Sequence, residues 1–127
     1  MKRVQSLEEL VQLKPQERAA LEDYLGRLQH RFGARVQHVI LFGSRARGEG
    51  DSESDVDVLV VLDNGNWRFH DEVALESFEP SLRYRVLISP VTMGRDDYDW
   101  HRQHRAPFYR LLEQDGLDLW TTSRALS

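Results

Sequence analysis

A near-continuous apolar run from Val56 to Leu62 constrains the fold of this 127-residue chain more than any other feature. Only its second residue, Asp57, is polar, so a strand over this run would bury both faces, as a central strand does between two layers of helices. The run from Val36 to Phe42 is also rich in β-branched and apolar residues and predicts a second strand. The sequence therefore predicts an α/β (α+β) fold, a small mixed β-sheet with helices packed on it.

Helical and turn signals surround these two runs. Ser6 and Glu9 have the spacing of a capping box and predict a short helical turn. Pro15 suits the first position of a helix that has one apolar face, and Gly33 ends this helix. The further expected elements are a helix from Trp67 to Glu79 ended by Pro80, a strand from Arg83 to Ser89 that Pro90 stops or marks as an edge, a helix from Asp96 to Gly116 broken at Pro107, and a short strand from Leu117 to Thr121.

Length and composition predict a single domain over residues 1–127, with enough apolar side chains for a core. The absence of cysteine excludes disulfides and thiolate metal sites and fits a cytoplasmic protein. We find no signal-peptide core and no apolar run long enough to cross a bilayer, so we expect no membrane association. A net charge of −4 disfavours a stand-alone polymerase or a general nucleic-acid binder, because such proteins are usually basic.

The polar stretch between the two strands carries the strongest chemical signal. Gly43 has no side chain, so a phosphate could approach its backbone closely. Ser44 is a good N-cap for a short turn, whose free amides and hydroxyl could hold phosphate oxygens. Arg45 and Arg47 would add positive charge near that turn.

Asp55 and Asp57 begin the second strand. Side chains two positions apart share a face of a strand, so these carboxylates would lie about 7 Å apart at their Cα atoms. Two carboxylates beside an apolar strand repel each other unless a cation is present. This arrangement suits a hard divalent cation that also contacts phosphate oxygens.

The spacing of Gly43-Ser44, ten residues and Asp55-Val56-Asp57 resembles the nucleotidyltransferase motif of the DNA polymerase β superfamily. The Arg-Ala-Arg-Gly after Gly-Ser looks like that of the minimal nucleotidyltransferases of bacteria and archaea, most clearly over residues 36–62. The resemblance implies Asp55 and Asp57 as catalytic and Mg²⁺-binding residues, with ATP as the nucleotide substrate. It implies a nucleotide-binding set of Gly43, Ser44, Arg45, Arg47, Gly48 and Ser54.

A third carboxylate, which usually comes from a later strand in this superfamily, is not evident here. Aligning the expected strand by Pro90 puts Val86 where many relatives have Asp, and no residue from Leu82 to Met93 is acidic. Either an acid from elsewhere fills the gap, or the site binds nucleotide and metal weakly and catalyses little. The acids considered for the first explanation are Glu72, Glu76, Asp96 and Asp97.

The resemblance also implies a partner. Larger relatives carry an extra domain for the acceptor, for which this chain has no room, so we expect the acceptor to be a protein. Minimal nucleotidyltransferases often act as antitoxins of HEPN ribonucleases, which predicts a protein-AMP transferase with a HEPN-like partner. Two alternatives stay open, a catalytically weak module that neutralises its partner by binding, and a small-molecule nucleotidyltransferase that holds its acceptor at a homodimer interface.

The C-terminal half offers weaker candidates. His101 and His104 could share a helix face as a metal pair, but a solvated helix surface is the favoured interpretation. The arginines of this half could contact an acidic partner or RNA, and ordinary solvated charge is again favoured.

Overall fold

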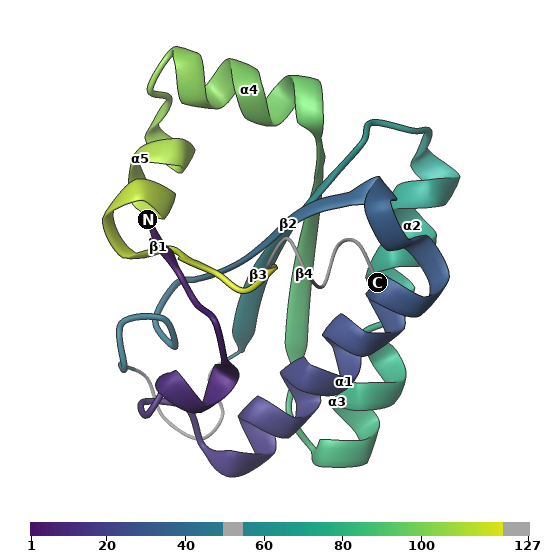
Figure 1. Cartoon of the computed structure of the whole chain (residues 1–127), viewed down its shortest axis with the longest axis vertical. Helices are drawn as coiled ribbons and strands as arrows, with labels where there is room; N and C mark the ends of the chain where they lie inside the picture. Colours follow the sequence, from purple (N-terminus) through teal and green to yellow (C-terminus); the bar gives the residue numbers. More distant parts are fainter. Residues whose placement is uncertain (50–54, 121–127) are drawn as a thin grey trace.

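Within residues 1–49 and 55–120, which the computed structural model describes, five strands form one mixed sheet in the order β1-β5-β2-β3-β4 (Figure 1). β3 lies inside this sheet, antiparallel to β2 and parallel to β4. This confirms the predicted central strand and the mixed sheet. The strands are β1 (Lys2–Arg3), β2 (Val36–Phe42), β3 (Val56–Leu62), β4 (Ile88–Gly94) and β5 (Leu117–Asp118).

Helices cover both faces of the sheet, and β3 contributes to both cores. Its residues Val58, Val60 and Leu62 join the core beneath the first three helices. Leu59 and Val61 pack with Tyr98 and Leu112 on the other face. The first face carries α1 (Pro15–Phe32), α2 (Trp67–Leu75) and α3 (Phe78–Tyr84), the second carries α4 (Arg95–Gln103) and α5 (Pro107–Asp115), and the 3-10 turns are η1 (Leu7–Glu9) and η2 (Gly33–Arg35).

Alternation along β3 decides where its acidic residue lies. Because successive side chains of a strand point to opposite faces, Asp57 shares a face with Leu59 and Val61. That is the face of α4 and α5, whereas α1 lies behind it. None of the helices in the described part of the chain is both long and apolar enough to span a bilayer.

The segment between β3 and β4 differs from its prediction. A single helix from Trp67 to Glu79 was expected, yet α2 ends at Leu75 and α3 continues to Tyr84. Pro80 does not end a helix, because it lies in the first turn of α3, where its missing N–H has no helical partner to lose. The expected strand from Arg83 to Ser89 is therefore wrong in its bounds, since β4 begins only at Ile88.

The sequence predicted that Pro90 either stops a strand or marks an edge strand. Pro90 lies within β4, and β4 is the edge strand of the sheet, so the second prediction is confirmed. The amide of Ile88 turns away from β3 and donates to Ser81 Oγ at 3.1 Å. Amide directions alternate along a strand, so Pro90 lacks its N–H on that same outer edge. At these two positions the edge therefore offers no donor for pairing with another chain.

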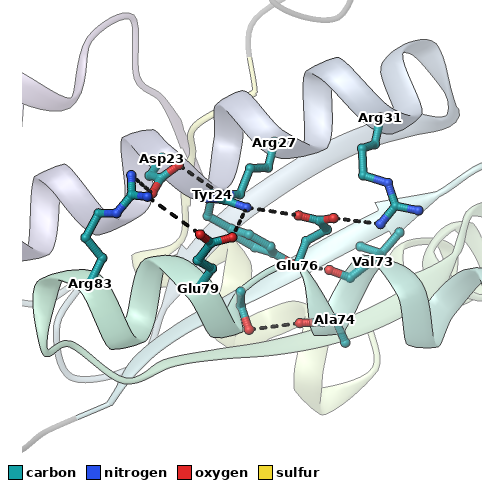
Figure 2. A network of polar contacts seen from close by, with 10 residues as sticks. Asp23, Tyr24, Arg27, Arg31, Val73, Ala74, Glu76, Glu79 and Arg83 are labelled. Carbon is teal, nitrogen blue, oxygen red and sulfur yellow. Dashed lines mark hydrogen bonds and ion pairs between the residues drawn. The ribbon is translucent and has the colours of Figure 1, made fainter.

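Tyr24 joins α1 to the end of α2 through a buried hydrogen bond. Its ring is fully buried, and its hydroxyl donates to the carbonyl oxygen of Val73 at 2.8 Å (Figure 2). The helical donor that would normally reach this carbonyl, the amide of Ser77, instead donates to Ala74. Burial raises the pKa of Tyr24 far above its ordinary value, so the hydroxyl stays protonated and remains a donor.

We expect Tyr24→Phe to lower the free energy of unfolding by about 1–2 kcal/mol, because it leaves the Val73 carbonyl buried without this donor. Urea unfolding followed by circular dichroism measures the change. Tyr109→Phe is the matched control, since Tyr109 is only half-buried and the substitution keeps the ring that packs edge-on against Tyr98, so the loss of its hydroxyl should change little. Equal stability of Tyr24→Phe and the wild type would contradict this role of the hydroxyl.

Candidate functional site

The chain leaves β2 in a tight turn. Gly43 has a φ of +78°, in the left-handed region that favours glycine. The turn closes with a bond from the Glu49 amide to the Ser44 carbonyl oxygen at 2.8 Å. Among the described residues, the amides of Ser44, Arg45 and Ala46 donate to no backbone carbonyl. The turn therefore presents consecutive amide groups that an anion could bind, as the sequence predicts.

The pairing of β2 with β3 brings Asp57 to this turn. Phe42, the last residue of β2, is the register partner of Asp57. A Cβ atom built on Gly43 would lie 2.7 Å from Asp57 Oδ2, which is closer than such contacts occur. A side chain at position 43 would strain the backbone at this φ angle and would displace the Asp57 carboxylate from its position. Gly43, Ser44 and Asp57 thus form one site.

Asp55 lies next to β3, one residue before its start, and its charge acts on Asp57. Burial, and to a lesser extent the negative charge of Asp55, raises the pKa of Asp57 above its ordinary value. Both residues are half-buried, so water and ions can reach them. A divalent cation would neutralise this repulsion, and carboxylate oxygens are the donors that Mg²⁺ prefers. The residues present therefore fit a Mg²⁺ ion held by Asp55 and Asp57.

The position beside Asp57 on the next strand belongs to Ser89. Ser89 is the register partner of Asp57 in the parallel pairing of β3 with β4. Val86, which the sequence alignment placed there, lies instead before β4 and is buried in the core under α1. The alignment failed because it assumed a strand that began several residues too early. A serine hydroxyl thus occupies the place where a third carboxylate would be expected.

The four acids considered as substitutes lie elsewhere. Glu76 binds Arg31 of α1 at 2.6 Å (Figure 2). Glu72 lies 3.7 Å from the same arginine, and both acids belong to the face of the sheet opposite Asp57. Asp96 and Asp97 open α4, which follows the far end of β4. In the described ranges, no three His, Cys, Asp or Glu side chains gather as a metal site. None of these four acids therefore replaces the third carboxylate beside Asp57.

The predicted phosphate-binding residues differ in their surroundings. Arg45 is buried and its guanidinium binds Glu17, so its charge is neutralised inside the domain and it is not free beside the turn. Arg47 is exposed and pairs with Glu49 at 3.0 Å. Gly48 has a φ of +76°, so glycine is favoured there by the backbone conformation of the turn. Ser54 lies outside the described residues.

Sequence reasoning missed two residues that contact the turn, Glu17 and Gln12. Glu17 binds Arg45 at 2.7 Å, and Gln12 Nε2 donates to the Ala46 carbonyl oxygen at 3.2 Å. The position of Glu17 in the first helical turn could have suggested a capping role, but nothing local indicated a partner 28 positions away. Of the two histidines considered, His101 and His104 each bond a backbone carbonyl of α4, at 2.7 and 2.9 Å.

Comparisons with known proteins agree with this geometry. The family model for the nucleotidyltransferase domain matches residues 21–109. A Methanocaldococcus jannaschii protein named "Putative protein adenylyltransferase MJ0604" is 40% identical over 104 residues, which cover 82% of this chain and 98% of that protein. A second protein of that organism, named likewise with the designation MJ0141, is 41% identical over 58 residues, covering 45% of this chain and 59% of its own length.

A solved structure shares the fold. It is a crystal structure of a mutant of the toxin–antitoxin pair MntA-HpeT, with a TM-score of 0.51 and 16% sequence identity. The match covers 83% of this chain and 77% of that one. At this identity the likeness supports the arrangement of strands and helices alone.

Replacing Asp57 by asparagine should stabilise the metal-free fold. A raised folded-state pKa means that protonation of Asp57 favours the folded state, and this stabilisation is lost as the pH rises through the folded pKa. Asp57→Asn should therefore raise Tm by about 1–4 °C at pH 7.5, a small change because the group is partly solvated. The gain should shrink as the pH falls through the folded-state pKa towards the ordinary value of 3.8, because the wild-type carboxyl then becomes protonated in the folded protein.

Calorimetry in a chelator between pH 4.5 and 8 measures this difference. Asp63→Asn serves as the control, since Asp63 binds Arg35 at 3.2 Å and its neutralisation should bring no gain. An Asp57→Asn protein that is less stable than the wild type at pH 7.5 would show that the site holds no such repulsion.

Proposed function

The chain belongs to the nucleotidyltransferase domain family, and we propose that it transfers AMP from ATP to a hydroxyl group of a partner protein. One observation carries this proposal, the position of the Asp57 carboxylate where a side chain of residue 43 would lie, at the start of the Ser44 turn. This position brings together the Asp57 carboxylate, which suits a divalent cation, and the amides of the turn, which suit phosphate. The name of the relative with 40% identity supports the choice of adenylyl transfer.

The residues of the site divide this work. Ser44 and the free amides after it would bind the terminal phosphates of ATP and fix the orientation of the triphosphate. Asp55 and Asp57 would hold Mg²⁺, and the ion would supply positive charge to neutralise the departing pyrophosphate. Gly43 lets the carboxylate and the turn approach each other. The acceptor oxygen then bonds to the α-phosphorus as the bond to the pyrophosphate oxygen breaks, and the proton of the hydroxyl passes to solvent or a nearby base.

Activation of the acceptor hydroxyl is the weak point of this site. Ser89 lies beside Asp57, so no third carboxylate is available from β4 to accept the proton. We therefore expect the chemical step, rather than nucleotide binding, to limit the rate. The serine at position 89, in place of a carboxylate, also favours a second candidate function. In that function the chain neutralises its partner by binding, with little or no AMP transfer.

A protein acceptor fits the surface around the site. Leu87, one residue before β4, and Val91 in β4 lie two positions to either side of Ser89, and their side chains are 59% and 46% exposed. Exposed apolar residues beside a polar site suit a partner that covers them. The fold neighbour is a toxin–antitoxin pair, and on this basis we propose a cytoplasmic HEPN-type toxin as the partner and this chain as its antitoxin.

We expect purified protein, Mg²⁺ and labelled ATP to add AMP to a helical partner encoded beside this chain. Asp57→Asn should lower the rate by about 100-fold or more, because it removes a carboxylate from the cation site. Intact mass spectrometry of the partner measures the addition, and Asp63→Asn should retain full activity. Equal neutralisation of the toxin by wild type and Asp57→Asn would favour the binding function over transfer.

Ser89→Asp tests the missing carboxylate directly. The new side chain would lie beside Asp57 and could both bind the cation and accept the acceptor proton. We expect the concentration of Mg²⁺ needed for half-maximal activity to fall and kcat to rise by about tenfold, whereas KM for ATP changes little. The control Thr92→Asp adds the same charge farther along β4 and should bring no gain. No rise in kcat would argue that the missing acid does not limit this site.

A further inference from the structure

Arg45, a residue predicted to contact phosphate, is held inside the protein by a dense set of hydrogen bonds. Only 5% of its surface is exposed. Its Nε and Nη2 atoms donate to the two carboxylate oxygens of Glu17 at 3.0 and 2.7 Å. Nη2 also donates to the Gln12 carbonyl oxygen at 3.0 Å, and Nη1 donates to the Glu49 carbonyl oxygen at 2.8 Å. The guanidinium therefore connects both ends of the turn to the N-terminal segment.

Glu17 is fixed as firmly as its partner. It is 4% exposed, and its Oε1 atom also accepts the amide of Lys14 at 2.7 Å, at the start of α1. One carboxylate thus binds both the beginning of a helix and the arginine of the turn. A further contact, from Gln12 Nε2 to the Ala46 carbonyl oxygen, ties the middle of the turn to the same segment.

Without these contacts the turn has little to hold its shape. Glycines with positive φ angles, Gly43 and Gly48, stand at its two ends, and glycine has the largest backbone freedom of any residue. Two of its backbone hydrogen bonds are long, at 3.4 Å from Arg47 to Gly43 and 3.3 Å from Gly48 to Arg45. The amides proposed to bind phosphate belong to this same turn. Their direction therefore depends on side chains from outside it.

A buried ion pair of this kind adds little net stability, because both charges lose their hydration. Its effect is instead to select one arrangement, since any other would leave a buried charge without a partner. We infer that Arg45 is a positioning residue, which Glu17 and Gln12 hold so that the Ser44 turn keeps the shape that binds the triphosphate. This inference rests on the proposed function, and it assigns Arg45 to the support of the nucleotide site rather than to direct contact with phosphate.

Isothermal titration with ATP and Mg²⁺ tests the inference without need of a partner protein. Arg45→Lys keeps the charge but loses the paired bonds to Glu17, and we expect it to weaken ATP binding by about tenfold. Glu17→Gln should weaken binding to a similar degree. The control Arg18→Lys changes bonds to the Leu10 and Leu13 carbonyl oxygens in the same N-terminal segment, and it should alter ATP binding by less than about twofold.

Glu17→Gln also separates positioning from direct contact. If Arg45 bound phosphate itself, the loss of the Glu17 charge would release it and tighten ATP binding, which would overturn the inference. In AMP-transfer assays, Arg45→Lys should raise KM for ATP while kcat stays within about threefold and KM for the partner is unchanged. A general loss of structure would lower kcat as well, so equal losses in both parameters would also count against positioning.

Circular dichroism and Tm show whether each variant folds. Should Arg45→Lys fail to fold, Gln12→Ala takes its place, because it removes only the bond to the Ala46 carbonyl oxygen and leaves the ion pair intact. We expect it to weaken ATP binding by about threefold, and unchanged binding would overturn the inference. Absence of ATP binding by the wild type would sink the proposed function itself, whereas wild-type binding matched by Arg45→Lys would sink only the positioning role.

Discussion

The pairing of β2 with β3 is the constraint on which the site depends. It sets Phe42 opposite Asp57, and so places the Asp57 carboxylate against the first residue of the turn. A shift of register by one residue would send Asp57 to the face covered by α1, among fully buried side chains. The cost of burying an unpaired carboxylate opposes that shift, because the other residues of β3 are apolar and would stay buried on either face. The core and the site are therefore fixed by the same hydrogen-bonded ladder.

The domain treats its concentrated charges in two different ways. The Glu17–Arg45 pair is buried, and each charge has a partner of opposite sign. Asp55 and Asp57 share one sign and are only half-buried, and burial together with their repulsion raises the pKa of Asp57. A folded protein keeps such an unfavourable arrangement where a ligand relieves it, so an unpaired acidic pair points to function. The paired charges, in contrast, hold the turn in which that ligand would lie.

Different strands supply different parts of the proposed chemistry. In the proposed function, the turn after β2 would bind the nucleotide, and the acids beside the start of β3 would bind the cation. Activation of the acceptor depends on β4, which lies at the sheet edge and presents Ser89 there. Nucleotide binding and the rate of transfer can therefore vary independently in this fold. This separation explains how one architecture could serve both an active transferase and a module that only binds its partner.

The sequence by itself determined the parts that depend on short-range geometry. The strand at 56–62, the helix from Pro15 and the glycine turn after β2 follow from residue patterns within one short segment. The bounds of β4, the place of Ser89 beside Asp57 and the burial of Arg45 against Glu17 were decided only by the tertiary structure. These features depend on which segments pack together, and a charged side chain 28 positions from its partner leaves no periodic pattern along the chain.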